Sequence, residues 1–375
     1  MKTIVLVTTS YPSVNDGSEA AGSFVQDFAE ELANKARVIV LAPGQNKSEA
    51  SSQPYLQVRR YAASTKPLSL LKLSKPWHWT AILKVLHSGA KALEQIIQEN
   101  QVDHVFALWV LPSGWWALSV NKKYGVAYST WALGSDIWSL GKIPLIRSLL
   151  IKVLQGSRHN FADGYQLAAD VKAISARECL FLPSTRNIAL PAETADSEDT
   201  GYKLAFLGRW HPNKGIDLLL EGLKLLDEEA WQKIDELRIY GGGPLQDTVR
   251  EGVKKLTSEG RKISMGGYLD KAAAARLLQW SDYVLIPSRI ESVPVIFSDA
   301  MKMGKPVLCT PVGDMGQLIS QYECGLLAEN VSARAFAELL SLALQKDKKT
   351  FEKGIARAAE DFSLPSIVET FCQSI

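Results

Sequence analysis

The sequence has few of the features that mark a crosslinked or metal-bound protein. Four cysteines occur in 375 residues, at positions 179, 309, 324 and 372, and no two of them form a C-x-x-C pair. Disulfide frameworks and zinc sites need closer spacing, so free thiols and a reducing, cytoplasmic environment are expected. An Asp-x-Asp pair, a common metal-binding pattern, is also missing. The sequence therefore predicts neither a disulfide scaffold nor a metal site.

Long uninterrupted hydrophobic runs are missing as well. The run Thr3–Val7 is too short for the core of a signal peptide, and no cleavage site of small residues follows it. Residues 105–121 carry no charge over 17 positions, but Pro112-Ser113-Gly114 interrupts them. A strand, a loop and a helix fit this stretch better than a membrane span. We therefore expect no segment that crosses a membrane.

The composition is that of an ordinary globular protein, with 46% apolar and 22% charged residues, which excludes disordered and fibrous classes. The length suggests about two to three domains, each large enough to bury a core. The net charge of +2 is the sum of a basic first half and an acidic second half. Residues 1–185 contain 19 Lys/Arg and 13 Asp/Glu, whereas residues 186–375 contain 23 and 27. The two halves are expected to meet different partners.

Short β-branched runs alternate with amphipathic helical segments along most of the chain, and a polar stretch at residues 191–200 interrupts the alternation. Before it, strands are expected at 3–8, 38–41, 105–108 and 126–130, and helices at 22–35 and 113–123. After it, strands are expected at 203–207, 236–240, 262–265, 283–286 and 306–309, and helices at 215–226, 245–256, 272–278 and 295–303. Such alternation predicts parallel sheets covered by helices.

We therefore predict an α/β protein with two doubly wound, Rossmann-like domains. The first domain is expected at residues 1–190, the linker at 191–200 and the second domain at 201–364. Residues 365–375 are expected to form a short amphipathic helix. Open α/β sheets bind ligands beyond the carboxyl ends of their strands, so the site is expected in a central cleft that the two domains face.

Two basic segments in the first half also contain aromatic residues. Residues 50–93 include no acidic residue, seven Lys/Arg and the pair Trp77 and Trp79, and residues 137–162 combine four Lys/Arg with Trp138. Such segments suit an anionic membrane surface, although solvated faces with core tryptophans would give the same pattern. No nucleic-acid-binding motif is present, so nucleic acid is not an expected partner.

Several strand-to-helix loops carry residues suited to an anionic ligand. Gly22 and Ser23 open a helix whose free N–H groups attract an anion. Arg209 and Lys214 stand five residues apart before another helix, where Arg can fork two phosphate oxygens and Lys adds a point charge. The turn at residues 240–244 (YGGGP) is not a G-x-G-x-x-G pattern, so a dinucleotide site is not supported.

The most specific stretch is residues 286–301, which read IPSRIESVPVIFSDAM. Glu291 and Asp299 stand eight residues apart, on a loop and on the helix that follows it. Carboxylates accept hydrogen bonds from sugar and ribose hydroxyls, and the N–H groups at the start of the helix donate to phosphate.

Together these segments resemble the large family of retaining GT-B glycosyltransferases, similar to glycosyltransferase family 4, that includes sucrose synthases and bacterial mannosyltransferases of lipid carriers. The resemblance extends over nearly the whole chain. The matching segments are Tyr11-Pro12 with Gly22, the loop 208–215, the turn 240–244, residues 281–288, the Glu291 segment, residues 304–307 and residues 311–314.

The resemblance implies a nucleotide-diphosphate-sugar donor and a set of site residues. Arg209 and Lys214 would hold the diphosphate and Glu291 would face the donor sugar, which makes these three the expected catalytic residues. The remaining expected donor-binding residues are Gly22, Gly208, Ser292, Val293, Pro294, Val295, Ile296 and Asp299. The final helix would cross back onto the first domain.

Two positions depart from the family pattern. The E-x₇-E motif of the family ends here in Asp299, which is one methylene shorter and is expected to accept from the ribose. The family's His before Gly-x-Asp is replaced by Leu133, and Asp136 is a possible contact of the sugar or the acceptor.

The expected function is retaining transfer of a sugar to a glycan or lipid-linked acceptor in cell-surface glycan or glycolipid synthesis. No metal or other cofactor is expected, because Arg209 and Lys214 can stabilise the departing diphosphate. The protein is expected in the cytoplasm, peripherally at the inner face of the membrane. A sugar-nucleotide-binding protein without transfer activity, and another GT-B activity such as an epimerase or phosphorylase, are the alternatives.

Overall fold

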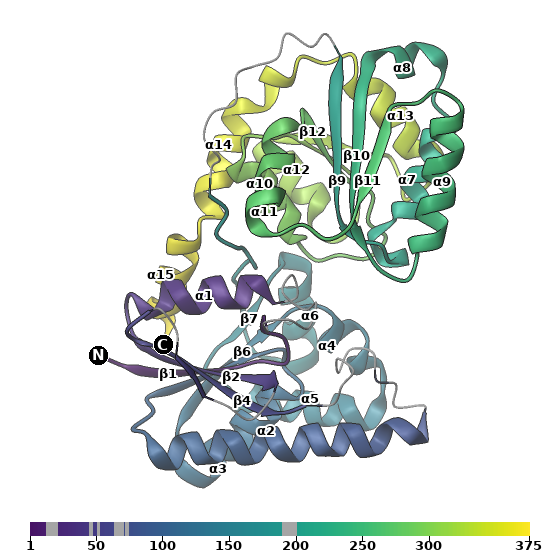
Figure 1. Ribbon diagram of the computed structural model, residues 1–375. Helices are drawn as coiled ribbons and strands as arrows, with labels where there is room; N and C mark the ends of the chain where they lie inside the picture. The colour runs from purple at the N-terminus through teal and green to yellow at the C-terminus, as the bar shows by residue number, and fades with distance from the viewer. Residues whose placement is uncertain (13–21, 45–47, 51–52, 64–70, 72–74, 190–200) are drawn as a thin grey trace. The chain divides into compact units, whose positions relative to one another are not determined.

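The structure is a computed structural model that describes residues 1–12, 22–44, 48–50, 53–63, 71, 75–189 and 201–375 (Figure 1). The chain forms two compact units. Unit 1 contains Met1–Pro183 together with Ile367–Ile375, and unit 2 contains Ser184–Ser366. The polar stretch predicted as the linker, 191–200, lies within residues 190–200, which are outside the described part of the chain. All four cysteines are free thiols, as expected.

Unit 1 is built on a sheet of eight strands that is parallel except for the pairing of β3 with β4. The strand order is β3-β4-β2-β1-β5-β6-β7-β8. The strands are β1 (Thr3–Val7), β2 (Arg37–Gly44), β3 (Ser48–Ala50), β4 (Leu56–Ala62), β5 (His104–Leu108), β6 (Ala127–Ala132), β7 (Asn160–Ala162) and β8 (Cys179–Phe181). Every residue of β1 and β5 is buried, which is the pattern of central strands covered on both faces.

Helices cover both faces of this sheet. In Figure 1, α2, α3 and α5 lie on one face, and α1 and α15 lie on the other. The helices are α1 (Ser23–Ala33), α2 (Trp79–Glu99), α3 (Ser113–Tyr124), α4 (Ser135–Trp138), α5 (Pro144–Gly156), α6 (Tyr165–Ser175) and α15 (Leu364–Ser374), with short 3₁₀ turns η2 (Pro76–His78) and η3 (Leu140–Lys142). Within the described ranges, no helix is long and apolar enough to cross a membrane.

The last helix completes the core of unit 1. The Phe371 ring in α15 lies 4.2 Å from the Phe106 ring in β5 and 5.6 Å from the Phe28 ring in α1, measured between centroids. Phe371 is fully buried. Residues from the far end of the chain therefore cover strands from its first third.

Unit 2 has a fully parallel sheet of six strands in the order β11-β10-β9-β12-β13-β14. The strands are β9 (Tyr202–Arg209), β10 (Ile234–Gly242), β11 (Ile263–Gly266), β12 (Tyr283–Ile286), β13 (Val307–Cys309) and β14 (Gly325–Leu327). The strand order changes direction between β9 and β12. In a doubly wound sheet, ligands bind beyond the carboxyl ends of the strands at this switch point.

Helices again lie on both faces of the sheet (Figure 1). They are α7 (Ile216–Leu223), α8 (Glu228–Lys233), α9 (Gln246–Ser258), α10 (Lys271–Trp280), α11 (Val295–Lys302), α12 (Met315–Tyr322), α13 (Ala333–Ala343) and α14 (Glu352–Asp361), with 3₁₀ turns η4 (Pro212–Lys214) and η5 (Lys348–Phe351). The predicted α/β class with two doubly wound sheets is therefore confirmed.

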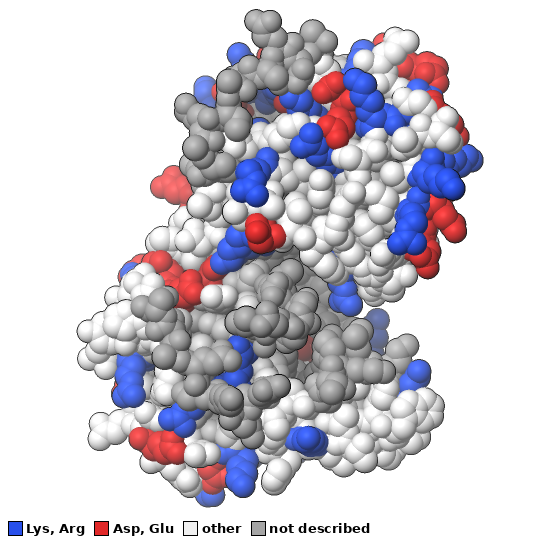
Figure 2. Space-filling model, in the orientation of Figure 1, with Lys and Arg blue, Asp and Glu red and all other residues white. Residues whose placement is uncertain are grey.

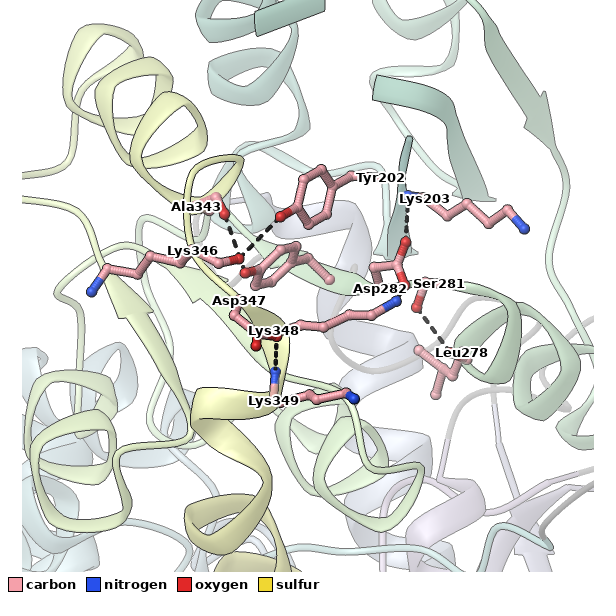
Figure 3. A network of polar contacts seen from close by, with 11 residues as sticks. Tyr202, Lys203, Leu278, Ser281, Asp282, Ala343, Lys346, Asp347, Lys348 and Lys349 are labelled. Atoms are coloured by element: carbon pink, nitrogen blue, oxygen red, sulfur yellow. Dashed lines mark hydrogen bonds and ion pairs between the residues drawn. The ribbon is translucent and has the colours of Figure 1, made fainter. Parts of the chain in front are cut away.

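A polar network holds the amino ends of β9 and β12 (Figure 3). Asp282 accepts from the Lys203 backbone N–H at 2.8 Å and pairs with Lys348. The Tyr202 hydroxyl donates to the Lys346 carbonyl at 3.0 Å. This network lies at the edge of the sheet opposite the switch-point loops, so it stabilises the scaffold rather than contributing to the site.

Candidate functional site

Most of the predicted site residues lie in, or directly beside, three neighbouring loops at the carboxyl edge of unit 2. They are the β9–α7 loop (210–215), the β12–α11 loop (287–294) and the β13–α12 loop (310–314). Strand β12 pairs with both β9 and β13, so the three loops leave the sheet side by side.

The β9–α7 loop is packed closely against the β12–α11 loop. Gly215 has φ +67°, and a Cβ at this position would lie 1.8 Å from the Pro287 carbonyl oxygen. Only glycine allows this approach without a backbone shift. Just before it, His211 caps η4, because its Nδ1 accepts from the Asn213 backbone N–H at 3.2 Å. The end of this turn places Lys214 beside the neighbouring loop.

Lys214 and Glu291, predicted as catalytic residues, form an ion pair between the two loops. The Glu291 side chain is 14% exposed and that of Lys214 is 35% exposed. The backbone of Glu291 is held from the third loop, because Gly313 has φ +52° and a Cβ there would lie 2.2 Å from the Glu291 carbonyl oxygen. The pair is therefore fixed on a closely packed backbone.

Arg209, the third predicted catalytic residue, ends β9 on the same edge and is exposed. Within the described part of the chain its guanidinium forms no hydrogen bond or ion pair. Partial burial lowers the pKa of His211, and the positive charges of Arg209 and Lys214 lower it further. The loop thus carries two cations close together. Such a loop can bind an anionic group. Gly208, predicted to contact the donor, precedes Arg209 in β9.

The predicted donor-binding residues 292–296 lead into α11. Ser292 and Val293 are buried, Pro294 is the N-cap residue, and Val295 and Ile296 begin the helix. The first N–H groups of a helix have no partner within it, so they can donate to a ligand. The buried Ser292 hydroxyl also has no hydrogen-bond partner among the described residues. An unpaired buried hydroxyl beside Glu291 is suited to a polar ligand.

Asp299 has a partner that the sequence did not indicate. Its fully buried carboxylate accepts from Arg186 Nε at 2.7 Å and Nη2 at 2.6 Å. Lys302, one turn further along α11, donates to the Arg186 carbonyl at 2.8 Å. Arg186 lies in the segment that follows unit 1, so α11 holds this segment in place. Contact between Asp299 and a ribose stays a prediction.

In unit 1, Gly22 and Asp136 lie at the starts of helices. Gly22 has φ +80°, and a Cβ there would lie 2.7 Å from the Ser10 carbonyl carbon, so the chain approaches itself closely before α1. Asp136 is buried and accepts from the N–H groups of Val110 at 2.7 Å, Ile137 at 3.2 Å and Leu133 at 3.3 Å.

Asp136 therefore joins the loop after β5 to the loop after β6. Burial raises its pKa to about 6, and the backbone N–H groups partly oppose that rise. The same carboxylate holds Trp109–Val110, where Trp109 has φ +63°, an unusual conformation for a bulky residue. The structure gives Asp136 a backbone-holding role, and its contact with a sugar or acceptor stays a prediction.

A comparison with known families finds a match in the C-terminal region. Residues 201–346, which include all three switch-point loops, match the family described as glycosyl transferases group 1. The match covers most of unit 2. The Lys214–Glu291 pair, Arg209 and the start of α11 all lie within the matched residues.

Curated proteins that are similar to parts of this chain are named as glycosyltransferases. A 169-residue stretch is 27% identical to the D-inositol 3-phosphate glycosyltransferase of Jonesia denitrificans and covers 44% of this chain and 40% of that protein. A 254-residue stretch is 23% identical to the putative teichuronic acid biosynthesis glycosyltransferase TuaC of Bacillus subtilis and covers 64% of this chain and 60% of that protein. The matches thus span less than two thirds of these relatives.

Solved structures match the fold over the whole chain. Sucrose-phosphate synthase from Thermosynechococcus elongatus aligns with a TM-score of 0.77 at 19% identity, covering 100% of this chain and 98% of that one. Anabaena HepE, solved in complex with UDP-glucose, aligns with a TM-score of 0.73 at 14% identity, covering 100% and 99%. The two units are the Rossmann-like domains of a GT-B fold, which confirms the predicted architecture.

Proposed function

We propose that the protein is a retaining glycosyltransferase that moves a sugar from a nucleotide-diphosphate donor to a glycan or lipid-linked acceptor in cell-surface glycan or glycolipid synthesis. The main support is the Lys214–Glu291 pair at the switch point of the glycosyltransferase domain, beside exposed Arg209. The domain match and the names of its relatives support the reaction class.

The chemistry follows from the charges at these loops. Glycosyl transfer passes through an oxocarbenium-like state while a nucleoside diphosphate departs. Arg209, Lys214 and the N–H groups at the start of α11 are donors that can stabilise the departing negative charge. Glu291 is assigned to the sugar, where positive charge develops. A diphosphate would compete with Glu291 for Lys214, so donor binding would separate the ion pair.

Retention needs no additional side chain in this proposal. The acceptor hydroxyl gives its proton to the departing phosphate oxygen on the same face of the sugar, so the leaving group serves as the base. Because Arg209 and Lys214 supply positive charge at the diphosphate, the proposed reaction uses no metal. Transfer that continues at full rate in excess EDTA is the expected result.

Substitution of the two cations tests the proposed diphosphate site. Arg209→Ala and Lys214→Ala should each weaken nucleotide binding or transfer by roughly 10- to 150-fold, since a charge-assisted hydrogen bond contributes about 1.5–3 kcal/mol. Affinities for UDP, GDP and ADP can be measured by calorimetry. Lys224→Ala is the control, because Lys224 pairs with Glu221 on an exposed helix face. Full activity and affinity in both site variants would show that the diphosphate site is misassigned.

The products of the reaction separate the alternatives. Release of a nucleoside diphosphate with transfer to an acceptor, and an anomeric configuration equal to that of the donor by NMR, is expected. Binding of a nucleotide-sugar without any turnover would instead indicate a sugar-nucleotide-binding protein. Conversion of the donor sugar into an isomer would indicate an epimerase.

We also propose that the protein binds peripherally, from the cytoplasmic side, to an anionic membrane surface through η2 and the start of α2. Trp77, Trp79 and Leu83 are 70%, 53% and 63% exposed, and Lys84 on the same helix is exposed. Lys75 lies over the Trp77 ring at 5.6 Å. The described surface toward this end of α2, at the lower right of Figure 2, is mostly uncharged with scattered basic residues. Exposed aromatics with nearby lysines suit the headgroup region of a bilayer.

A further inference from the structure

Arg289 connects the two loops that carry Lys214 and Glu291. A single guanidinium nitrogen, Nη1, donates to the Pro212 carbonyl at 2.9 Å and to Asp217 Oδ1 at 2.7 Å. The Arg289 backbone N–H donates to the Asn213 carbonyl at 2.7 Å. Arg289 thus contacts the β9–α7 loop through its side chain and through its backbone.

These contacts lie close to both site residues along the chain. Pro212 is two residues before Lys214, and Arg289 is two residues before Glu291. Asp217 lies in the first turn of α7, so the guanidinium also ties the β12–α11 loop to the start of that helix. Arg289 therefore joins the two loops next to the residues that form the ion pair.

We propose that Arg289 is a positioning residue that keeps Lys214 and Glu291 at the spacing required by the donor. The inference rests on the proposed function, which assigns Lys214 to the diphosphate and Glu291 to the sugar. A diphosphate takes Lys214 away from Glu291, and the ion pair then no longer holds the two loops together. The atoms that Arg289 contacts have no assigned role toward the donor. The Arg289 contacts therefore persist and hold the loops in place while the donor is bound.

Kinetics of Arg289 variants test this role. Arg289→Ala should lower kcat by about 10- to 100-fold, because small misplacements of catalytic groups have large effects on rate. KM for the donor should change much less, because Lys214 itself is still present. Arg289→Lys keeps a cation within reach of Pro212 and Asp217 and should recover part of the loss. Asp217→Asn leaves the contact with Pro212 and should have a smaller effect than Arg289→Ala.

Arg250→Ala is the matched control. Arg250 pairs with Asp247 at 3.3 Å on the exposed face of α9. Arg250→Ala therefore also removes an Arg–Asp ion pair, but one that lies outside the candidate site. Its kcat and KM should equal those of the unmodified protein.

Hydrogen–deuterium exchange of residues 209–217 separates positioning from general stabilisation. In Arg289→Ala, exchange should increase more in the presence of saturating nucleoside diphosphate than in its absence, since the Lys214–Glu291 pair still joins the loops when no nucleotide is bound. UDP, GDP and ADP are tried in turn, and the one that binds the unmodified protein is used.

Three results would overturn the inference: an unchanged kcat in Arg289→Ala, an equal increase in exchange with and without nucleotide, or no recovery by Arg289→Lys. Failure of the proposed function is distinguishable from these results. It appears in the unmodified protein, as absence of nucleotide binding and of transfer, before any variant is compared.

Discussion

Glu291 and Asp299 are both carboxylates of one motif, yet the structure places them in different surroundings. Glu291 lies on a loop and is partly exposed beside Lys214. Asp299 is fully buried and paired with Arg186. The roles assigned to the two carboxylates can therefore be tested separately.

Steady-state kinetics should separate these two carboxylates. Glu291→Gln is expected to lower mainly kcat, because charge develops on the sugar in the transition state. Asp299→Asn is expected to raise KM more than it lowers kcat, because the ribose is unchanged in the reaction.

If Asp299 contacts the ribose, Asp299→Asn should also reduce the preference for UDP over 2′-deoxy-UDP. If the preference for UDP over 2′-deoxy-UDP is unchanged, Asp299 does not contact the ribose and its role is to bind Arg186. Full kcat in Glu291→Gln would contradict its catalytic assignment.

The buried carboxyl of Asp136 gives a prediction about pH. Its pKa is raised from 3.8 to about 6 in the folded protein. Between these two pH values the carboxyl group is protonated in the native state and ionised in the unfolded chain. The contribution of this group is therefore fully present below about pH 4 and is lost as the pH rises through about 6. Urea unfolding of the native protein and of Asp136→Asn, compared at pH 4.5 and 6.5, measures it.

The free energy of unfolding of the unmodified protein, relative to that of Asp136→Asn, should fall over this pH interval. A relative stability that instead rises with pH would mean that hydrogen bonds from Val110, Leu133 and Ile137 outweigh burial.

At the scale of loops and helices, the close packing of the β9–α7 loop depends on Gly215. A Cβ there meets the Pro287 carbonyl oxygen, and the φ of +67° adds backbone strain for any other residue. Gly260 has φ +85° with no atom within 4 Å of a Cβ, so a substitution there introduces backbone strain but no steric collision. Comparing substitutions at Gly215 and Gly260 therefore separates the collision from the strain.

Gly215→Ala should lower the free energy of unfolding and should reduce kcat, because the collision shifts the loop that carries Lys214. Gly260→Ala should show only the strain, about 1–2 kcal/mol, with kcat unchanged. Chemical denaturation and steady-state rates provide both measurements. Equal effects of the two substitutions on kcat would show that the contact with Pro287 does not matter for the site.

The elements, and the loops that carry the candidate site, could be predicted from sequence because their signals are local. Strands β1, β9 and β12 are short β-branched or aliphatic runs, and residues 286–301 combine a strand end, a loop and a helix start within a few turns. Other features have no local signal. Arg186 and Asp299 are 113 residues apart, and Arg289 and Asp217 are 72 apart. Only the folded sheet brings such residues together.

At the scale of the whole molecule, the proposed membrane surface predicts binding that depends on charge. The protein should sediment with vesicles of phosphatidylglycerol and phosphatidylcholine, and less with phosphatidylcholine alone. Binding should fall as NaCl is raised from about 50 to about 500 mM, because the Debye screening length shortens to about 4 Å at the higher concentration. Trp77→Ser with Trp79→Ser should weaken binding about tenfold or more, because two large exposed aromatics are lost.

Leu225→Ser is the control for this experiment, because Leu225 is an exposed apolar residue of unit 2. It should bind vesicles as the unmodified protein does. Equal sedimentation with neutral and anionic vesicles at low salt would contradict the proposal.

The position of α15 affects the order in which the protein can fold during synthesis. Residues 367–375 belong to unit 1, and Phe371 packs between Phe28, Phe106 and Phe161. The ribosome makes these residues after the whole of unit 2. Unit 2 can therefore complete its core while the aromatic surface of unit 1 is still uncovered. Until α15 leaves the ribosome, the aromatic surface of unit 1 stays accessible to water, chaperones and other nascent chains.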